Sequence, residues 1–217
     1  MAGERFRDRR EAGRVLASLL QEEAGDDVVV LALPRGGVPV AWEVARALGA
    51  PLDVLVVRKL GVPGHEELAM GAVASGRVLV VNGDVTAGLG IADEEVERAA
   101  RAALAAVEER EARYRAGRPA LDVRGRRAVL VDDGLATGAT MRAAASAVAR
   151  AGAGAVVVAV PVGAAEVCAR LRREVDALVC ARTPSPFRAV GAWYRDFEPT
   201  SDEEVRDLLA RPPADAP

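Results

Sequence analysis

Two neighbouring carboxylates, followed by a turn of small and hydroxyl residues, form the stretch of this sequence best suited to chemistry. The stretch reads AVLVDDGLATGAT and covers residues 128–140. Its apolar start, Ala128 to Val131, predicts a buried strand, and in open α/β sheets ligands bind at the C-terminal ends of such strands. Asp132 and Asp133 follow directly, so we expect them at a ligand-binding edge.

The turn after the acids has the composition of a phosphate-binding loop. Gly134 and Gly138 allow bends that point successive backbone N–H groups inward, and Thr137 and Thr140 add hydroxyl donors. The loop opens an Ala-rich helix, whose N-terminal N–H groups and dipole favour an anion. Two acids here would repel a lone phosphate, but a sugar phosphate offers hydroxyls and can share Mg²⁺ with further phosphate groups. An ordinary βα turn with surface acids is the alternative interpretation.

This stretch resembles, without gaps, the phosphoribosyl-pyrophosphate (PRPP) signature of the type I phosphoribosyltransferases. The resemblance implies that Asp132 and Asp133 bind the ribose hydroxyls and that Asp132 reaches Mg²⁺ indirectly, through ribose or water. It also implies that the 5′-phosphate is bound by Gly134, Leu135, Ala136, Thr137, Gly138, Ala139 and Thr140. The chain is most similar to bacterial phosphoribosyltransferase-like proteins with an LPRGGVPVA start and a VDDGLATGAT centre.

A second strand, turn and helix carries a guanidinium group. Val28 to Leu33 predicts a buried strand that runs into Pro34-Arg35-Gly36-Gly37, and Val38 to Leu48 predicts the helix that follows. Backbone N–H groups freed by paired glycines, together with the planar fork of Arg35, would suit a pyrophosphate. The family resemblance implies this role for Arg35, Gly36 and Gly37, because a short loop at this place binds the pyrophosphate of PRPP. Taken alone, the four residues are equally consistent with a plain turn.

Charged residues also stand at the end of the strand predicted over Leu52 to Val57. They are Arg58 and Lys59, and Lys59 is the only lysine of the chain. Glycines and a proline interrupt Leu60 to Leu68, which predicts a mobile loop. Met70 to Ala74 and Val78 to Val81 then predict a hairpin.

The resemblance implies that this loop closes over PRPP and excludes water from an oxocarbenium-like centre. Arg58 and Lys59 would then neutralise the departing pyrophosphate, and His65 or Glu66 would reach the ligand only in the closed state. The alternative for Arg58 and Lys59 is a solvated strand end. For His65 the alternative is that a loop histidine has no function.

Aromatic residues gather in Arg182 to Phe197, although they make up only 3% of the chain. In the resembling family a small hood over the sheet binds the acceptor, often by stacking an aromatic ring on a base. Phe187 is the first candidate for this role and Tyr194 the second. The alternative is that these rings anchor an irregular segment to the core.

The whole pattern predicts an α/β fold with a mainly parallel open sheet flanked by helices, Rossmann-like as in type I phosphoribosyltransferases. A flexible-loop hairpin and a small C-terminal hood complete it. Further helices are predicted over Phe6 to Glu23, over Asp93 (as N-cap) to Arg115, from the phosphate-binding loop to Ala151, over Ala164 to Arg173 and after the Ser201 cap. Further strands are predicted over Leu121 to Val123, Ala155 to Val160 and Ala177 to Ala181. We expect one domain over residues 1–217, with the core at about 26–181, the flexible loop and hairpin at about 58–82 and the hood at about 182–210.

Composition narrows the function classes. The net charge of −3 and the pI near 5.4 disfavour a nucleic-acid partner. The charged N-terminus lacks an apolar signal core and no apolar run reaches the length of a membrane span, so we expect no membrane partner and a cytoplasmic location. Two cysteines, Cys168 and Cys180, have no metal-ligand or disulfide-framework spacing and suit a reduced cytosol.

The sequence therefore predicts a pentosyltransferase that moves the 5-phosphoribosyl group from Mg–PRPP to a nitrogenous base and releases pyrophosphate. Its catalytic residues would be Arg35, Arg58, Lys59, Asp132 and Asp133, acting mainly by positioning and charge stabilisation. A homodimer is an expectation by analogy with the family.

The acceptor base stays open at this level. Ala136 stands where enzymes acting on 6-oxopurines usually carry a third acid, which argues mildly against guanine or hypoxanthine. Two other function classes also fit: a non-catalytic PRPP sensor that regulates a protein partner, and a phosphoribosyl hydrolase or phosphorolase that uses water or phosphate.

Overall fold

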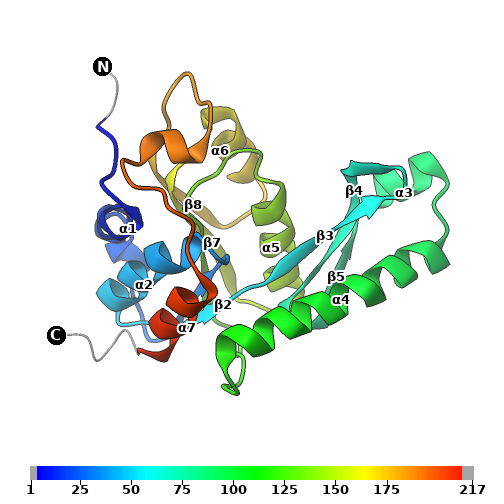
Figure 1. Cartoon of the computed structure of the whole chain (residues 1–217), viewed down its shortest axis with the longest axis horizontal. Helices are drawn as coiled ribbons and strands as arrows, with labels where there is room; N and C mark the ends of the chain where they lie inside the picture. The colour runs from blue at the N-terminus through cyan, green and yellow to red at the C-terminus, as the bar shows by residue number, and fades with distance from the viewer. Residues whose placement is uncertain (1–3, 212–217) are drawn as a thin grey trace.

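The computed structural model describes residues 4–211, apart from the side chains of Glu66 and Glu67. Its centre is a five-stranded sheet (Figure 1). Across the sheet the strands run in the order β2 (Leu52–Val54), β1 (Val28–Ala32), β6 (Arg127–Val131), β7 (Ala155–Val162) and β8 (Ala177–Arg182). Every neighbouring pair is parallel, which confirms the predicted fold class.

Strands β1 and β6 lie side by side at the centre and end at the same level. Their register pairs Val28 with Arg127 and Ala32 with Val131. All five residues of β1 are buried, as expected for an apolar strand of a parallel sheet. The turns that follow the two strands, residues 33–37 and 132–138, therefore begin next to each other.

Helices cover both faces of this sheet, because alternate side chains of each strand point to opposite faces. One face is covered by α1 (Arg9–Ser18) and α2 (Gly37–Leu48), and the other by α5 (Ala139–Arg150) and α6 (Ala165–Leu171). In β1, for example, Val30 belongs to the first apolar layer and Leu31 to the second. A short helical turn, Gln21–Glu23, follows α1.

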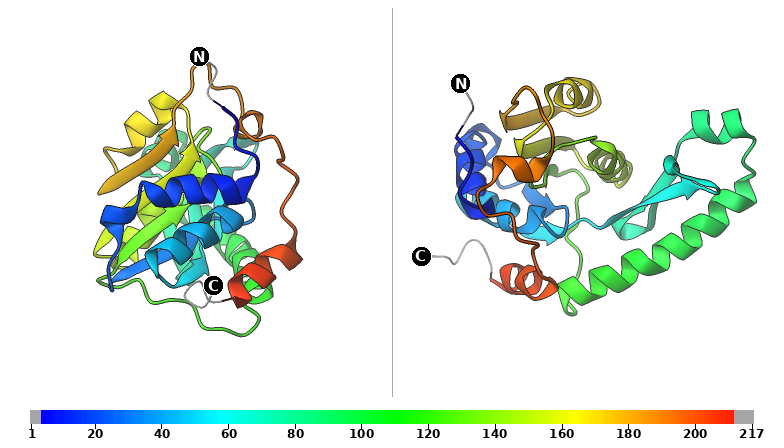
Figure 2. Two further views of the ribbon diagram at one scale, coloured as in Figure 1. Left: turned by 90° about the vertical axis from the view of Figure 1, so that its left-hand side faces the viewer. Right: turned by 45° about the horizontal axis from the view of Figure 1, so that its top comes forward.

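A second, antiparallel sheet forms an arm that extends away from the core (Figure 2, right). Its strands are β3 (Val57–Val62), β4 (His65–Ala74) and β5 (Val78–Val81), with a helical turn at Ser75–Arg77. The arm continues through α3 (Gly83–Leu89) and returns along α4 (Asp93–Arg115), the longest helix. The predicted hairpin of Met70 to Ala74 and Val78 to Val81 is thus confirmed.

The prediction that Leu60 to Leu68 lacks regular structure is wrong, because the chain forms strands through most of this segment. Its mobility stays a prediction. Leu60 and Val62 are 3% and 5% exposed and belong to the apolar cluster that includes α4 residues. Gly61 lies at register shifts of the β3–β4 ladder, and Gly64 takes a φ of +78° in the tight turn. The glycines that suggested a break are therefore used in a bulge and in a hairpin turn.

Three smaller differences separate the predicted elements from the observed ones. Leu121 to Val123 does not form a strand; only an isolated bridge joins Arg124 to Ala153. Asp93 is the first helical residue of α4 and Ala92 occupies the N-cap position without a side-chain cap. Helix α3 was not predicted, since its GDVTAGL sequence holds two glycines and little apolar periodicity.

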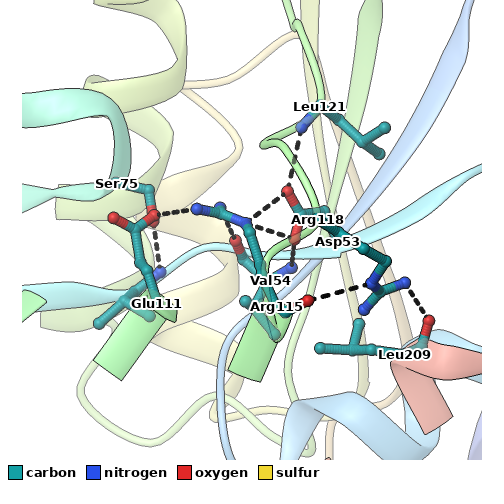
Figure 3. Close-up of polar contacts among 9 residues, drawn as sticks. Asp53, Val54, Ser75, Glu111, Arg115, Arg118, Leu121 and Leu209 are labelled. Atoms are coloured by element: carbon teal, nitrogen blue, oxygen red, sulfur yellow. Dashed lines mark hydrogen bonds and ion pairs between the residues drawn. The ribbon is translucent and has the colours of Figure 1, made fainter. Parts of the chain in front are cut away.

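A buried ion-pair network attaches the end of α4 to the core strand β2 (Figure 3). The Nε of Arg115 lies 2.9 and 3.0 Å from the two carboxylate oxygens of Asp53, and its Nη1 lies 2.7 Å from Glu111 Oε1. Backbone N–H groups of Val54 and Leu121 also donate to Asp53, at 2.7 and 3.1 Å. This network fixes the arm at its base.

The C-terminal segment, called the hood after the prediction for residues 182–210, packs against the turn that follows β6, where the hydroxyl of Tyr194 donates to the carbonyl of Asp133. It contains a helical turn at Val190–Trp193 and ends in α7 (Asp202–Ala210). Ser201 caps α7 by accepting a hydrogen bond from the N–H of Glu204 at 3.0 Å, as its spacing predicted. The hood is tied to the N-terminal segment because Phe6 and Tyr194 form a parallel β-bridge. Within residues 4–211, no helix combines the length and the apolar character needed to cross a membrane.

Candidate active site

The two turns at the C-terminal ends of β1 and β6 pack tightly against each other. A Cβ atom on Gly36 would overlap the carboxylate of Asp133, and one on Gly37 would lie 2.7 Å from the carbonyl oxygen of Val131 and 2.9 Å from Cα of Asp132. Gly36 has ordinary helical angles, so glycine is required here by space rather than by backbone conformation. The peptide bond between Pro34 and Arg35 is cis. The two predicted motifs therefore meet in one place.

The two acids share a poorly solvated environment. Burial raises the pKa of Asp132 well above its ordinary value, and the charge of Asp133 raises it further. Burial also raises the pKa of Asp133, although the guanidinium of Arg9 opposes that shift. The N–H of Asp133 donates to Asp132 Oδ1 at 2.8 Å. The ionised form of each carboxylate is thus solvated incompletely by its surroundings, and a ligand could complete that solvation.

Arg9 is a site residue that the sequence analysis missed. Its Nε lies 2.9 Å from Asp133 Oδ2, and the two side chains are only 11% and 15% exposed. The guanidinium also lies 3.9 Å from the ring centroid of Phe197, and Nη1 donates to the carbonyl of Glu198 at 2.7 Å. Arg9 therefore connects α1, the hood and the acid pair. Nothing in the arginine-rich N-terminus distinguishes this residue from its neighbours.

The loop from Gly134 to Thr140 is held at one point and open at others. Leu135 is buried, donates its N–H to the carbonyl of Val162 at 2.8 Å and accepts from the N–H of Ala164 at 2.9 Å. Gly138 forms the N-cap of α5 with a φ of +75° and without a side-chain cap. The side chains of Ala136, Thr137 and Thr140 are exposed. The N-terminal amides of α5 therefore face an accessible surface, which suits an anion.

Arg35 and Asp202 form an ion pair at 3.6 Å, which directs the Arg35 side chain toward α7. Asp202 also lies 3.1 Å from Arg113 Nη1 and 3.0 Å from the hydroxyl of Tyr114. The side chain of Arg35 is 49% exposed. A long, half-exposed ion pair of this kind exchanges partners at low cost.

Arg58 and Lys59 lie on opposite faces of β3, as consecutive residues of a strand do. Arg58 shares its face with the buried Leu60 and lines a pocket formed with α4. Lys59 lines a cavity of about 430 Å³ whose other wall includes Ala139 at the start of α5. Lys59 and the start of α5 therefore line the same cavity, whereas Arg58 is directed elsewhere.

The predicted loop residues lie at the tip of the arm. His65 begins β4 and is exposed. The backbone of Glu66 belongs to the same strand, but its side chain lies outside the described part of the chain. Closure of this segment over a ligand stays a prediction.

Tyr194 is packed as an anchor of the hood. It is 3% exposed, its ring centroid lies 5.6 Å from that of Phe6 and 4.9 Å from that of Phe197, and its hydroxyl donates to the carbonyl of Asp133 at 2.6 Å. Burial raises the pKa of this hydroxyl and keeps it protonated. Phe187 is half-buried between the hood cluster and the α5–α6 layer. Of the two predicted acceptor-binding rings, only Phe187 keeps an appreciable open surface.

The chain is similar in sequence and in structure to known proteins. Residues 6–184 match the family model described as the phosphoribosyl transferase domain. Two curated sequences from strains of Mycobacterium tuberculosis, each named "Putative phosphoribosyl transferase", are 50% identical over 206 residues, which is 95% of this chain and 46% of theirs. The chain thus spans about half the length of these relatives. The crystal structure of TT1426 from Thermus thermophilus is 48% identical, covers 94% of this chain and 97% of its own, and superposes with a TM-score of 0.86.

Proposed function

This chain belongs to the phosphoribosyl transferase domain family, and we propose that it transfers the 5-phosphoribosyl group of Mg–PRPP to a nitrogenous base with release of pyrophosphate. The observation that carries the proposal is the packing of Gly36 and Gly37 against Asp132 and Asp133, next to the open N-terminus of α5. That arrangement supports the proposal, because the amides at one sheet edge would bind a phosphate, the carboxylates would bind hydroxyls, and the glycine turn would bind a second anion.

The 5′-phosphate would bind in the loop from Gly134 to Thr140. Its oxygens would accept hydrogen bonds from the N-terminal amides of α5 and from the exposed hydroxyls of Thr137 and Thr140. The remaining loop residues Leu135, Ala136, Gly138 and Ala139 would shape the backbone around it. The backbone hydrogen bonds of Leu135 with Val162 and Ala164 would keep the loop preorganised.

Asp132 and Asp133 would accept hydrogen bonds from the ribose hydroxyls. As the bond from C1 to pyrophosphate breaks, positive charge develops on the ribose, and the nearby carboxylates would stabilise it. Arg9 would hold the Asp133 carboxylate in place from the far side. This is electrostatic stabilisation by groups that are already oriented before the substrate arrives.

The pyrophosphate would lie over the turn of Arg35, Gly36 and Gly37, with Lys59 approaching from the arm. Arg35 would leave Asp202 to form charge-assisted hydrogen bonds with phosphate oxygens, which a half-exposed pair at 3.6 Å permits. The predicted role of Arg58 at the same pyrophosphate stays a prediction that requires the arm to rearrange, because Arg58 and Lys59 point to opposite faces of β3. His65 and Glu66 would contribute only after such a rearrangement.

Mg²⁺ would bind at this site mainly through oxygens of the substrate rather than through a set of protein ligands. Among the described residues no group of three or more histidine, cysteine or acidic side chains could hold a metal ion by itself. Asp132 would reach Mg²⁺ through the ribose or through water, and the ion would supply charge neutralisation to the phosphate oxygens.

The acceptor base would enter below the hood. Phe187 is the better candidate for stacking on it, and Tyr194 would act by holding the hood against the Asp133 turn. Because Ala136 stands where a third acid would be, the acceptor would be a base that needs no carboxylate from this loop.

Pyrophosphate release from Mg–PRPP tests the proposal, measured without acceptor and with a panel of purine, pyrimidine and pyridine bases. Release that depends on one base supports transfer and identifies the acceptor, whereas release with no base would indicate a hydrolase. Asp133→Asn and Lys59→Ala are expected to reduce turnover at least tenfold, and Arg150→Ala at the far end of α5 serves as the control. PRPP binding without release by any base would contradict transfer by this chain and favour a sensor.

A further inference from the structure

A second pocket with the character of an anion site lies between β3 and the C-terminal half of α4. It has a volume of about 220 Å³, and three of its lining residues are arginines: Arg58 from β3 and Arg110 and Arg113 from α4. Its floor includes the buried residues Val56 and Val107. None of its lining residues belongs to the loop of residues 134–140 or to the acid pair, and only Arg58 has a predicted role at the candidate active site.

The charge in this pocket is incompletely balanced. Glu109 is its only acidic lining residue, and Arg113 Nη2 already pairs with it at 2.9 Å. Within residues 4–211, neither Arg58 nor Arg110 forms an ion pair with a described side chain. This excess of positive charge occurs in a chain whose net charge is −3. Guanidinium groups above an apolar floor match a compact anion, because their planar forks bind phosphate oxygens in pairs.

One carboxylate connects this pocket to the candidate active site. Asp202 lies 3.1 Å from Arg113, which lines the pocket, and 3.6 Å from Arg35, which follows β1. An anion that attracts Arg113 would weaken its pair with Asp202. Asp202 would then hold Arg35 more firmly, and Arg35 would be less available to a pyrophosphate group in the active site.

We propose that the pocket lined by Arg58, Arg110 and Arg113 is an effector site for a phosphate dianion, either inorganic phosphate or the phosphoryl group of a monoester, and that its occupancy weakens PRPP binding. The coupling to PRPP rests on the proposed function, whereas the anion site itself does not. Because coupling between two sites is reciprocal, PRPP weakens binding of the anion by the same factor.

Titration calorimetry with inorganic phosphate tests the site in a Thr137→Val background, which weakens competing binding in the phosphate loop. Arg110 is exposed, so Arg110→Ala is expected to fold normally and to weaken the remaining phosphate binding at least tenfold. Arg98→Ala changes an exposed arginine of the same helix outside the pocket and is expected to have no effect. Undiminished phosphate binding in Arg110→Ala, or equal losses in both variants, would overturn the proposal.

Two further titrations identify the ligand and test the coupling. Ribose 5-phosphate binding more tightly than inorganic phosphate, and depending on Arg110, would identify a monoester, while equal affinities would identify free phosphate. Saturating phosphate is expected to weaken PRPP binding about fivefold more in the wild type than in Arg110→Ala, within the usual range of coupling. Equal weakening in the two proteins would overturn the coupling, and failure of the wild type to bind PRPP at all would count against the proposed function alone.

Discussion

Arg9 and Asp133 form an ion pair at 2.9 Å across 124 residues of sequence. The contact joins the first helix to the acid pair of the candidate active site, and both side chains are largely buried. The guanidinium favours the charged form of Asp133, because it opposes the rise in pKa that burial causes. It also makes the hood part of the site, because the same guanidinium stacks on Phe197 and binds the carbonyl of Glu198.

Replacing Arg9 with alanine is expected to destabilise the protein by about 3 kcal/mol at pH 7, because it leaves a buried carboxylate without its partner. The loss should shrink on acidification. The folded-state pKa of Asp133 is raised, and removal of Arg9 raises it further. The cost of the charged carboxylate is full above that pKa, falls as the pH drops below it, and is absent below about pH 3.8. Urea unfolding at pH 7 and pH 4.5 measures both effects.

Arg5→Ala is the matched control for Arg9, because Arg5 is an exposed arginine of the same N-terminal segment. We expect a change within about 0.5 kcal/mol for it. Arg9→Lys should recover part of the stability, since an ammonium group retains the charge but not the stacked fork. A loss for Arg9→Ala that is the same at both pH values would contradict the ion-pair account.

Asp132→Asn is expected to stabilise the folded protein at pH 8 while abolishing PRPP binding. The raised folded-state pKa of Asp132 means that its charge opposes folding above that pKa, and this cost is absent below about pH 3.8. An asparagine oxygen can still accept the hydrogen bond from the N–H of Asp133. A gain of about 1 kcal/mol, typical when a functional site is relaxed, would raise Tm by about 2–4 °C.

Thermal unfolding at pH 8 and pH 4 measures this gain, which should diminish at the lower pH. Asp122→Asn is the control, because Asp122 is exposed and Arg124 holds its pKa down to about 2. That variant should show no gain at pH 8. A less stable Asp132→Asn protein at pH 8 would show that the two acids do not strain the fold.

Gly36→Ala is expected to displace the Asp133 carboxylate and to weaken PRPP binding at least tenfold. The backbone angles of Gly36 suit alanine, so the effect would come from the overlap of Cβ with the carboxylate rather than from strain. Gly83→Ala is the control: Gly83 lies in α3, and nothing lies within 4 Å of its Cβ position. Calorimetry should find the Gly83 variant unchanged in PRPP affinity, and equal affinity for the Gly36 variant would refute the close approach.

Arg115→Ala is expected to destabilise the protein by about 3–5 kcal/mol, because it leaves Asp53 and Glu111 buried without their shared partner. Arg101→Ala removes an exposed ion pair of the same helix and should cost less than about 0.5 kcal/mol. Urea unfolding compares the two variants. If their costs are similar, the network does not anchor the arm.

The sequence was sufficient for most of the core. The apolar runs of β1, β6 and β7 are nearly continuous and have clear turn residues at their ends, so the positions of these strands could be predicted. Only the family resemblance implied that the turns after β1 and β6 serve one ligand. The arm was harder. Read locally, Gly61 and Gly64 predict a loop. Only the burial of Leu60 and Val62 against a helix distant in sequence shows why this segment forms strands.

The candidate site shows the same limit. Asp132, Asp133 and the glycine turns carry local motifs, whereas Arg9 is one arginine among many until the chain is folded. Alternation along β3 separates Arg58 from Lys59, although adjacency in sequence suggested a shared ligand. Tyr194 was predicted to face a base, but it is buried and its hydroxyl binds the carbonyl of Asp133, which no periodicity in the irregular hood indicates.

The most direct test of the account is calorimetric titration of PRPP, with and without Mg²⁺, into the wild-type protein and into Asp133→Asn. We predict saturable, Mg²⁺-dependent binding at one site per chain in the wild type. In the variant, whose thermal unfolding should show an intact fold, that binding should be at least tenfold weaker. Absence of PRPP binding by the wild type, or equal affinity in the two proteins, would contradict the central claim that this sheet edge is a phosphoribosyl site.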